Sequence, residues 1–213
     1  GRHMVGLKDS GVMPFVEKYL DDESKKVRDY GEYWSASSAG YCMRLNIFRL
    51  LGVPKTPEMA EKQVLTQRVF SVGHIFHEWI KDIIKKSGAS IASEVELQDE
   101  DLMIRGHFDD LIRIQYDESG ERLTYGSEPR GQQIMLYDYK TAHSDSFKYS
   151  MSRPMGHYHK YQLGTYLYIL RKDPSVIGKE YKAKDFIEAR TLSISKDDLR
   201  MQEKALIWND LIE

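Results

Sequence analysis

Apolar residues recur at helical spacing through the first part of the chain. They return every third or fourth position, a period typical of helices that bury one face. The pattern predicts helices over residues 12–30, 37–51 and 57–86. Thr56 is suited to cap the third of these helices, and Gly88 follows its end.

The second part of the chain changes to shorter, β-prone runs. Strands are predicted over residues 91–97, 102–116, 133–140 and 186–194, because these runs are apolar and rich in β-branched and aromatic residues. The polar, glycine-containing residues 117–132 are predicted to form a hairpin connection.

The remaining residues predict two helices and one loop. Residues 159–170 and the residues from Lys196 onward are expected to be helical, and the serine-rich residues 142–156 are expected to form an exposed loop. Together these elements indicate an α/β fold with a central mixed sheet flanked by helices. We expect one domain, mainly helical over residues 5–90 and with its sheet core over residues 91–213.

Composition narrows the class of protein. A chain of 213 residues can bury a sizeable core in one domain. Its single cysteine argues against a secreted fold built on disulfides. There is no apolar run of about eighteen residues that would predict a membrane span, and no signal-peptide pattern precedes Val5. We therefore expect a cytoplasmic protein, and we interpret residues 1–4 as a remnant of cloning.

The charges are unevenly distributed. A formal net charge of −2 excludes a globally basic nucleic-acid binder, but contacts to phosphates need only a local basic groove. We interpret Lys81, Lys85 and Lys86 as a solvated helix face. Residues 153–160, which include Arg153 and Lys160, either contact DNA or form an ordinary solvated surface.

Two carboxylates and a lysine are expected to meet on neighbouring strands. Side chains alternate faces along a strand, so Asp138 and Lys140 point the same way. Asp109 falls within the strand predicted over residues 102–116, and Asp110 is the alternative candidate beside it. Mg²⁺ prefers oxygen ligands, and a nearby ammonium group can stabilise negative charge on a phosphate. This combination predicts a metal site that hydrolyses phosphodiesters.

Two predicted helices add polar side chains to this candidate site. Gln162 and Tyr166 share a helix face because they are four residues apart, and His77 lies on the helix over residues 57–86. Each of these residues also has an ordinary structural explanation by itself. Their order and the elements that carry them favour the nuclease hypothesis.

The chain resembles a known nuclease family at these positions. The motifs are Gly73-x-x-x-His77, Gly106-x-x-Asp109, Asp138-x-Lys140 and Gln162-x-x-x-Tyr166. They are similar to those of the RecB-type branch of the PD-(D/E)XK nucleases, which includes the CRISPR-associated RecB-like exonucleases and phage relatives. Residues 34–44 also resemble the serine-rich opening and the Cys-x-Arg element of those proteins.

The resemblance implies a restriction-endonuclease-like core and metal-dependent cleavage of DNA, by exonuclease action that includes single strands. It implies Mg²⁺ or Mn²⁺ as the cofactor, with His77, Asp109, Asp138 and the Tyr139 carbonyl as ligands and Lys140 as the catalytic lysine. The implied DNA contacts are Ser37, Arg44, Arg153, Lys160, Gln162 and Tyr166.

The chain departs from this family in its cysteines. Several relatives hold an iron–sulfur cluster on four cysteines, whereas this chain has only Cys42. One thiolate cannot hold such a cluster, so we predict that none is bound. We interpret Cys42 as a small buried hydrophobic residue on a helix.

Two other classes of function stay open at this stage. The first is a DNA-binding or assembly subunit that keeps the fold without cleaving. The second is a zinc hydrolase whose ligands come from the histidines, since catalytic zinc usually takes three protein ligands. His74 and His77 are three residues apart, but the chain has no His-Glu-x-x-His pattern. The candidate zinc ligands are His74, His77, His107, His143, His157 and His159.

Overall fold

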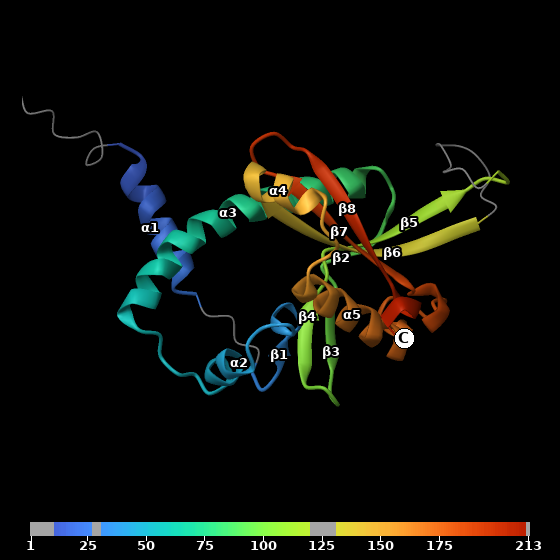
Figure 1. Ribbon diagram of the computed structural model, residues 1–213, viewed down its shortest axis with the longest axis horizontal. Coiled ribbons are helices and arrows are strands. Elements are labelled where there is room, and N and C mark those ends of the chain that lie inside the picture. Colours follow the sequence, from blue (N-terminus) through green and yellow to red (C-terminus); the bar gives the residue numbers. More distant parts are fainter. Residues whose placement is uncertain (1–10, 27–30, 120–130, 212–213) are drawn as a thin grey trace, which may run out of the picture.

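The computed structural model describes residues 11–26, 31–119 and 131–211 (Figure 1). Residues 1–4, interpreted above as a remnant of cloning, lie outside these ranges. Two sheets organise the described chain. The five-stranded sheet has the order β2-β5-β6-β7-β8, in which only β6 and β7 are parallel. Its strands are β2 (Ser90–Ser93), β5 (Asp110–Tyr116), β6 (Gly131–Ala142), β7 (Glu188–Ser195) and β8 (Met201–Ile207).

The smaller sheet has the order β1-β4-β3. Its strands are β1 (Trp34–Ser35), β3 (Glu96–Asp99) and β4 (Ile104–His107). The helices are α1 (Met13–Ser24), α2 (Met43–Leu50), α3 (Pro57–Lys86), α4 (Ser144–Met151) and α5 (His157–Lys172). Short 3-10 turns are η2 (Ala36–Ser38), η3 (Pro174–Val176), η4 (Ala183–Asp185) and η5 (Trp208–Leu211). These elements confirm the predicted α/β class, with mixed sheets flanked by helices.

Strand β6 separates two hydrophobic clusters because its side chains alternate faces. Leu136 packs in the cluster that includes Leu163 and Leu167 of α5. Tyr137 and Tyr139 pack in the other cluster, which includes Ile80 of α3. Helices α5 and α3 therefore bury opposite faces of β6, and the central strand is covered on both sides.

Helix α3 has 30 residues, more than any other helix in the described ranges. Its start is capped by Thr56, whose hydroxyl accepts a hydrogen bond from the Met59 N–H at 3.3 Å, as predicted. Gly88 follows its end with φ of +77°, a conformation that suits glycine. The first half of α3 packs beside α1 and extends away from the sheet, on the left of Figure 1.

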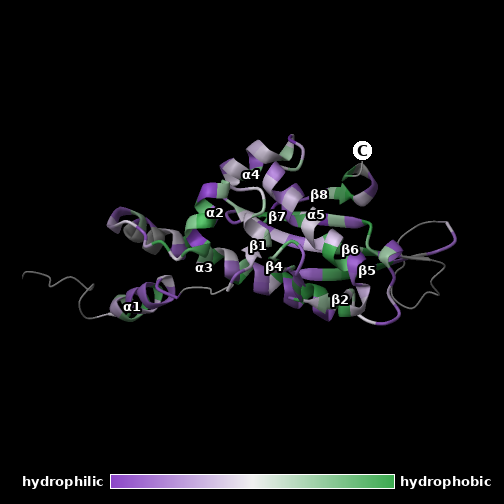
Figure 2. Cartoon of the chain, turned by 90° about the horizontal axis from the view of Figure 1, so that it is seen from below, coloured by the Kyte–Doolittle hydropathy of each residue, from purple (hydrophilic) through white to green (hydrophobic). Residues whose placement is uncertain are grey.

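The N-terminal helices leave apolar side chains exposed. Figure 2 shows apolar residues on α2 as well as within the sheet. On α2 these include Met43, Ile47 and Phe48, all of which are exposed. None of the helices in the described ranges is long and apolar enough to cross a membrane.

Two of the predicted strands are wrong, because each is divided between two strands in the structure. Residues 102–116 form β4 and β5, which belong to different sheets, and Phe108 between them is fully buried against Tyr166. Residues 91–97 divide between β2 and β3 in the same way. Glu94 takes a left-handed conformation at that division, with φ of 52°, which interrupts the extended chain.

The predicted helix over residues 37–51 is too long. Only α2 is an α-helix there, and Gly40 lies before it. A Cβ atom on Gly40 would stand 2.8 Å from the Tyr158 ring and 2.9 Å from the Tyr161 ring. This segment is therefore packed against α5 in a non-helical form. The first predicted helix is also shorter, since α1 ends at Ser24, and residues 27–30 lie outside the described ranges.

Two segments in the C-terminal half form a different secondary structure from the one predicted. The predicted loop over residues 142–156 contains α4, because Phe147 is fully buried and anchors a short helix. The helix predicted from Lys196 is instead strand β8. It pairs antiparallel with β7 from Ile194↔Met201 to Glu188↔Ile207, and this pairing outweighs the local helix propensity. The predicted connection over residues 117–132 lies mostly outside the described ranges.

Two further residues differ from their predicted surroundings. Lys81 is only 8% exposed and is paired with Glu78 at 2.7 Å and Glu94 at 2.6 Å, so it does not belong to a solvated face. Cys42 is exposed and precedes α2, and is not a buried hydrophobic residue. Hydrogen bonds from the backbone of Leu45 and Arg44 lower the pKa of its thiol, since free N–H groups stand at the start of a helix.

Candidate active site

Asp138 and Lys140 lie together on β6. Lys140 Nζ is 2.6 Å from Asp138 Oδ2, as the alternation of side chains along a strand predicts. The Asp138 side chain is 8% exposed and that of Lys140 is 30% exposed. Both side chains are on the face of β6 that α5 covers. The Lys140 ammonium group is therefore near the surface, and the Asp138 carboxylate beside it is buried.

Asp109 joins this pair from the point where the chain leaves β4 and enters β5. Its Oδ2 accepts a hydrogen bond from the Tyr139 N–H at 2.7 Å, and its side chain is also hydrogen-bonded to Asp138. The N–H and carbonyl of one strand residue leave the same edge of the strand, so the Tyr139 carbonyl is on the Asp109 side as well. Two carboxylates separated by 29 residues therefore meet across the break between the sheets.

His77 of α3 contacts the second carboxylate oxygen of Asp109. Its Nδ1 is 3.7 Å from Asp109 Oδ1, and its ring meets the Tyr139 ring edge-on at 6.4 Å between centroids. Asp109 thus stands between a histidine on α3 and the backbone of β6.

Helix α5 supplies the next contacts. Lys140 Nζ donates a hydrogen bond to Gln162 Oε1 at 3.0 Å, and Gln162 Nε2 donates one to the Tyr166 hydroxyl at 3.1 Å. Gln162 and Tyr166 are both buried. Their spacing of four residues places them on one helix face, and this face orients the lysine.

Close packing favours glycine at two positions of the motifs. A Cβ atom on Gly106 would stand 2.7 Å from the Ala36 Cβ and 3.2 Å from the Tyr166 ring. A Cβ atom on Gly73 would stand 3.0 Å from Thr141 Oγ1. Glycine therefore lets β4 approach η2 and α5, and lets α3 approach the end of β6.

The two carboxylates differ in their pKa values. Burial raises the pKa of Asp138 to about 6, and the neighbouring charge of Asp109 adds to this rise although Lys140 opposes it. Burial also tends to raise the pKa of Asp109, but its hydrogen bond and ionic attraction to His77, with the Tyr139 N–H, lower it overall. At acidic pH the pair therefore holds a proton on Asp138 and a charge on Asp109.

The donor atoms fit a hard divalent cation. Carboxylate and carbonyl oxygens are the ligands that Mg²⁺ prefers, and an imidazole also suits Mn²⁺. Asp138 Oδ2 is buried and makes no hydrogen bond, because the short contact with Lys140 is an ion pair without hydrogen-bond geometry. As the side chains stand in the described part of the chain, no three His, Cys, Asp or Glu residues converge as a ligand set. The fit therefore rests on the donors of Asp109 and Asp138.

Asp110 serves the opposite face of the sheet. It accepts hydrogen bonds from the Ser90 hydroxyl at 2.6 Å and from the Tyr139 hydroxyl at 2.8 Å, and burial raises its pKa. Of the two adjacent aspartates, the structure brings Asp109 to Asp138 and Lys140. Asp110 instead accepts the hydrogen bond that orients the Tyr139 side chain.

His159, named above as a candidate zinc ligand, also lies in this region. Burial lowers its pKa to about 4, and the charges of Lys140 and Lys204 lower it further. It precedes Gln162 by three residues, and this helical spacing places it near the same helix face.

The other predicted DNA contacts come from η2, α2, α5 and the segment between α4 and α5. Ser37 is exposed, with its hydroxyl 2.7 Å from that of Ser35, and Arg44 is exposed over the Phe48 ring. Arg153 stacks on Tyr149 with its guanidinium carbon 3.7 Å from the ring centroid. Lys160 is exposed on α5.

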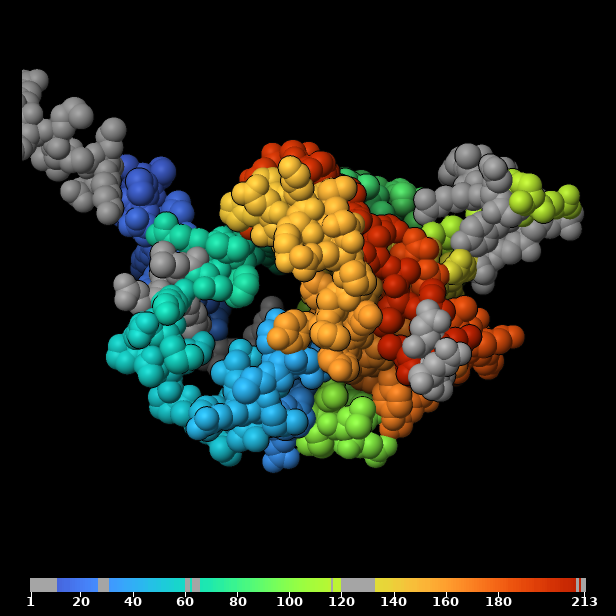
Figure 3. Space-filling view, viewed as in Figure 1, coloured from blue at the N-terminus to red at the C-terminus, as the bar shows by residue number. Residues whose placement is uncertain are grey.

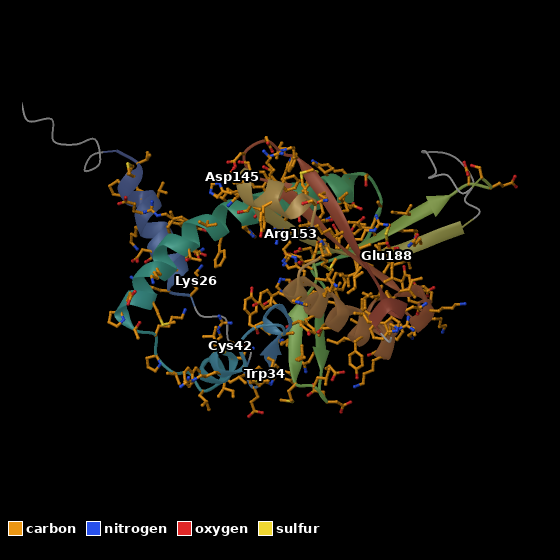
Figure 4. All side chains as sticks on the ribbon, viewed as in Figure 1. Lys26, Trp34, Cys42, Asp145, Arg153 and Glu188 are labelled. Carbon is orange, nitrogen blue, oxygen red and sulfur yellow. The ribbon has the colours of Figure 1, made fainter. Side chains whose placement is uncertain are left out.

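The molecule is hollowed beside this site. The space-filling view shows an opening bounded by α3, by the segment around α2 and by the corner between α4 and α5 (Figure 3). Arg153 lies on the α4–α5 side of this opening and Cys42 lies on the side of α2 (Figure 4). The segment before α2 contacts α5 at the border of this opening, where Tyr41 stacks on Tyr158 with ring centroids 4.4 Å apart.

Comparisons with known proteins show the fold alone. No protein-family model matches the chain, and neither does any curated protein sequence. Among solved structures, the crystal structure of SSO0001 is similar, with a TM-score of 0.53 over 90% of this chain and 76% of that chain. Sequence identity is 19%, so this likeness supports the architecture and not an activity.

Proposed function

We propose that this protein is a metal-dependent deoxyribonuclease of the RecB-type PD-(D/E)XK branch, with exonuclease action. One observation carries the proposal. Strand β6 supplies Asp138 and Lys140, the junction of β4 and β5 supplies Asp109, and α5 supplies Gln162, yet these residues form one connected polar cluster. A buried carboxylate pair beside a partly exposed lysine suits phosphodiester chemistry better than a structural role.

Asp109 and Asp138 would hold the divalent cation, with the Tyr139 carbonyl and His77 completing its shell. When bound, Mg²⁺ or Mn²⁺ lowers the pKa of a water molecule and neutralises charge on the scissile phosphate. Lys140 stabilises the charge that develops on the phosphate, since its ammonium group donates three hydrogen bonds and accepts none. Gln162 keeps this ammonium group in position, and Tyr166 in turn holds Gln162.

The test is a cleavage assay on labelled single-stranded and double-stranded DNA with Mg²⁺, Mn²⁺ or chelator. Wild-type protein should cleave with either metal, and Asp109→Ala and Asp138→Ala should abolish cleavage while the fold survives. Asp145→Ala is the matched control, because Asp145 is an exposed carboxylate on α4. If Asp109→Ala or Asp138→Ala cleaves at nearly the wild-type rate, the assignment of ligands is wrong.

The same assay separates the alternatives. A non-cleaving DNA-binding subunit would bind labelled DNA at equal protein concentration without producing fragments. A zinc hydrolase would contain zinc after purification and would lose activity when its histidine ligands are changed. His74, His107, His143 and His157 are all exposed, an arrangement that favours the carboxylate site.

A further inference from the structure

Helix α1 turns its apolar face away from its neighbour α3. Glu17 Oε1 of α1 lies 4.0 Å from Arg68 Nη2 of α3, so the Glu17 side of α1 faces α3. Phe15 and Tyr19 are each two residues from Glu17, which at about 100° per residue places them on the opposite side of the helix. Phe15 is 77% exposed, Tyr19 is 61% exposed and Val16 between them is also exposed. In the described part of the chain, this apolar face of α1 is therefore uncovered.

Helix α3 exposes an apolar ridge that begins beside α1. Val72, Ile75 and Trp79 follow Arg68 at intervals of four, three and four residues, so they lie on the helix face that carries Arg68. Ile83 continues this α3 ridge. Ile75 is 66% exposed, and the other three side chains are 40% to 42% exposed. Alternating intervals of three and four residues are the spacing of a coiled-coil seam, which is buried against another helix.

Neither the sheet nor the candidate active site uses the α3 ridge. Ile80 is on the side of α3 that packs on the sheet, and His77 is on the side that contacts Asp109. Trp79 is two residues from His77, so it points about 200° away from it around the helix. A protein that covered the ridge would therefore leave His77 and Asp109 accessible.

The charges beside both apolar faces are paired within their own helices. Lys18 Nζ is 2.6 Å from Asp22 Oδ2 on α1, and Lys86 Nζ is 2.7 Å from Asp82 Oδ2 on α3. A polyanion is attracted by cations that lack such partners. The two faces therefore fit an apolar helix better than they fit a nucleic acid or a strongly charged protein.

A second copy of the chain supplies a helix that fits the α3 ridge. Figure 1 shows α1 crossing the first half of α3, and Arg68 marks the contact between them. Packed helices lie roughly 8–10 Å apart and a helix rises about 1.5 Å per residue, so a further helix beside α1 would cross α3 about six residues beyond Arg68, near Ile75. The α1 of a second copy can lie there with its apolar face on the ridge, because its Glu17 side is occupied by its own α3.

We propose that the protein forms a two-fold symmetric dimer in which α1 of each copy packs on the α3 ridge of the other. The same contact then occurs twice, as two-fold symmetry requires. The rings of Phe15, Tyr19 and Trp79 would bury roughly 350 Å² on each copy, and the aliphatic side chains of the two faces add an area of the same order. Together they approach the roughly 800 Å² that each partner buries in an interface of standard size. This inference does not depend on the proposed nuclease function.

Analytical ultracentrifugation of the full chain tests the dimer, with chelator present and at concentrations from about 1 μM to about 100 μM. Wild-type protein should approach twice the monomer mass of 24.8 kDa. Phe15→Asp and Ile75→Asp should each raise the dissociation constant about a hundredfold, because each change acts at two places in the dimer. Val176→Asp is the matched control, since Val176 is an exposed apolar residue on η3, and it should dimerise as wild type does.

Disulfide cross-linking shows which helices meet. Cys42→Ser protein has no cysteine, so Phe15→Cys and Ile75→Cys can be added to it in separate preparations with tags of different mass. The two preparations are mixed under reducing conditions and then oxidised. A disulfide requires Cα atoms within about 7 Å, so the mixed dimer should exceed the amount that random pairing gives. Val176→Cys in place of Ile75→Cys should give no such excess.

The inference is overturned if wild-type protein stays monomeric at every concentration, if Phe15→Asp or Ile75→Asp dimerises as tightly as Val176→Asp, or if the mixed disulfide dimer is not in excess. Far-ultraviolet circular dichroism verifies that the aspartate variants keep the wild-type helix content. Failure of the nuclease proposal gives a different result. The dimer would then form and cross-link as described, but the protein would not cleave DNA with Mg²⁺ or Mn²⁺.

Discussion

Replacing Asp138 with asparagine should stabilise the metal-free protein while abolishing cleavage. Burial raises the pKa of this carboxyl from 3.8 to about 6, despite the ion pair with Lys140. The rise of about two pKa units corresponds to roughly 3 kcal/mol. Because the pKa is higher in the folded state, the stabilising effect of the protonated form is complete below about pH 4 and is lost as pH rises through about 6.

Asparagine keeps the shape of the side chain and removes its charge. At pH 7.5 in chelator, Asp138→Asn should therefore be more stable than wild type by up to about 3 kcal/mol. For a chain of this length the midpoint of thermal unfolding should rise by about 2–4 °C for each kcal/mol. The amide can also donate to Asp109, so the hydrogen bond between the two side chains is retained.

Urea unfolding followed from pH 4 to pH 7.5 measures this effect. Wild type should lose stability relative to Asp138→Asn across that range, and the exposed control Asp145→Asn should follow wild type within about 1 kcal/mol. Added Mn²⁺ should stabilise wild type and leave Asp138→Asn unaffected. The reasoning fails if Asp138→Asn is less stable than wild type at pH 7.5, or if it keeps the wild-type dependence on pH.

Three further predictions concern single positions. Lys140→Ala should lower single-turnover cleavage by roughly a hundredfold and leave calorimetric binding of Mn²⁺ unchanged, and Lys140→Arg should not restore the rate because a planar guanidinium does not replace a compact ammonium; normal cleavage by Lys140→Ala would remove the main support for the nuclease. Cys42→Ser should leave both activity and the visible absorption spectrum unchanged, and a brown protein that fades on this substitution would contradict the prediction that no iron–sulfur cluster is bound. Gly106→Ala should destabilise the fold by about 1–3 kcal/mol in urea unfolding, because its new methyl group overlaps the packing between η2 and α5. The control Gly156→Ala, where a Cβ atom meets nothing within 4 Å, should change stability far less.

Several features of this protein follow from short-range sequence patterns. The start of α3 is set by Thr56 and Pro57, whose effects act within one helical turn. The shared face of Asp138 and Lys140 follows from the two-residue repeat of a strand, and that of Gln162 and Tyr166 from the helical repeat. These relations involve neighbours along the chain, so they can be predicted without knowing what packs against them.

Tertiary contacts determined the rest. Met201–Ile207 contains good helix formers but is a strand, because β7 offers an edge with which it can pair. Lys81 is buried because Glu94, which is distant in sequence, supplies a second carboxylate. The break at Asp109 exists because Phe108 is buried where the chain passes between two sheets, and this break delivers the carboxylate to Asp138. Pairing and burial join residues that are far apart in sequence, and their free energies exceed the small local preferences that a sequence pattern reports.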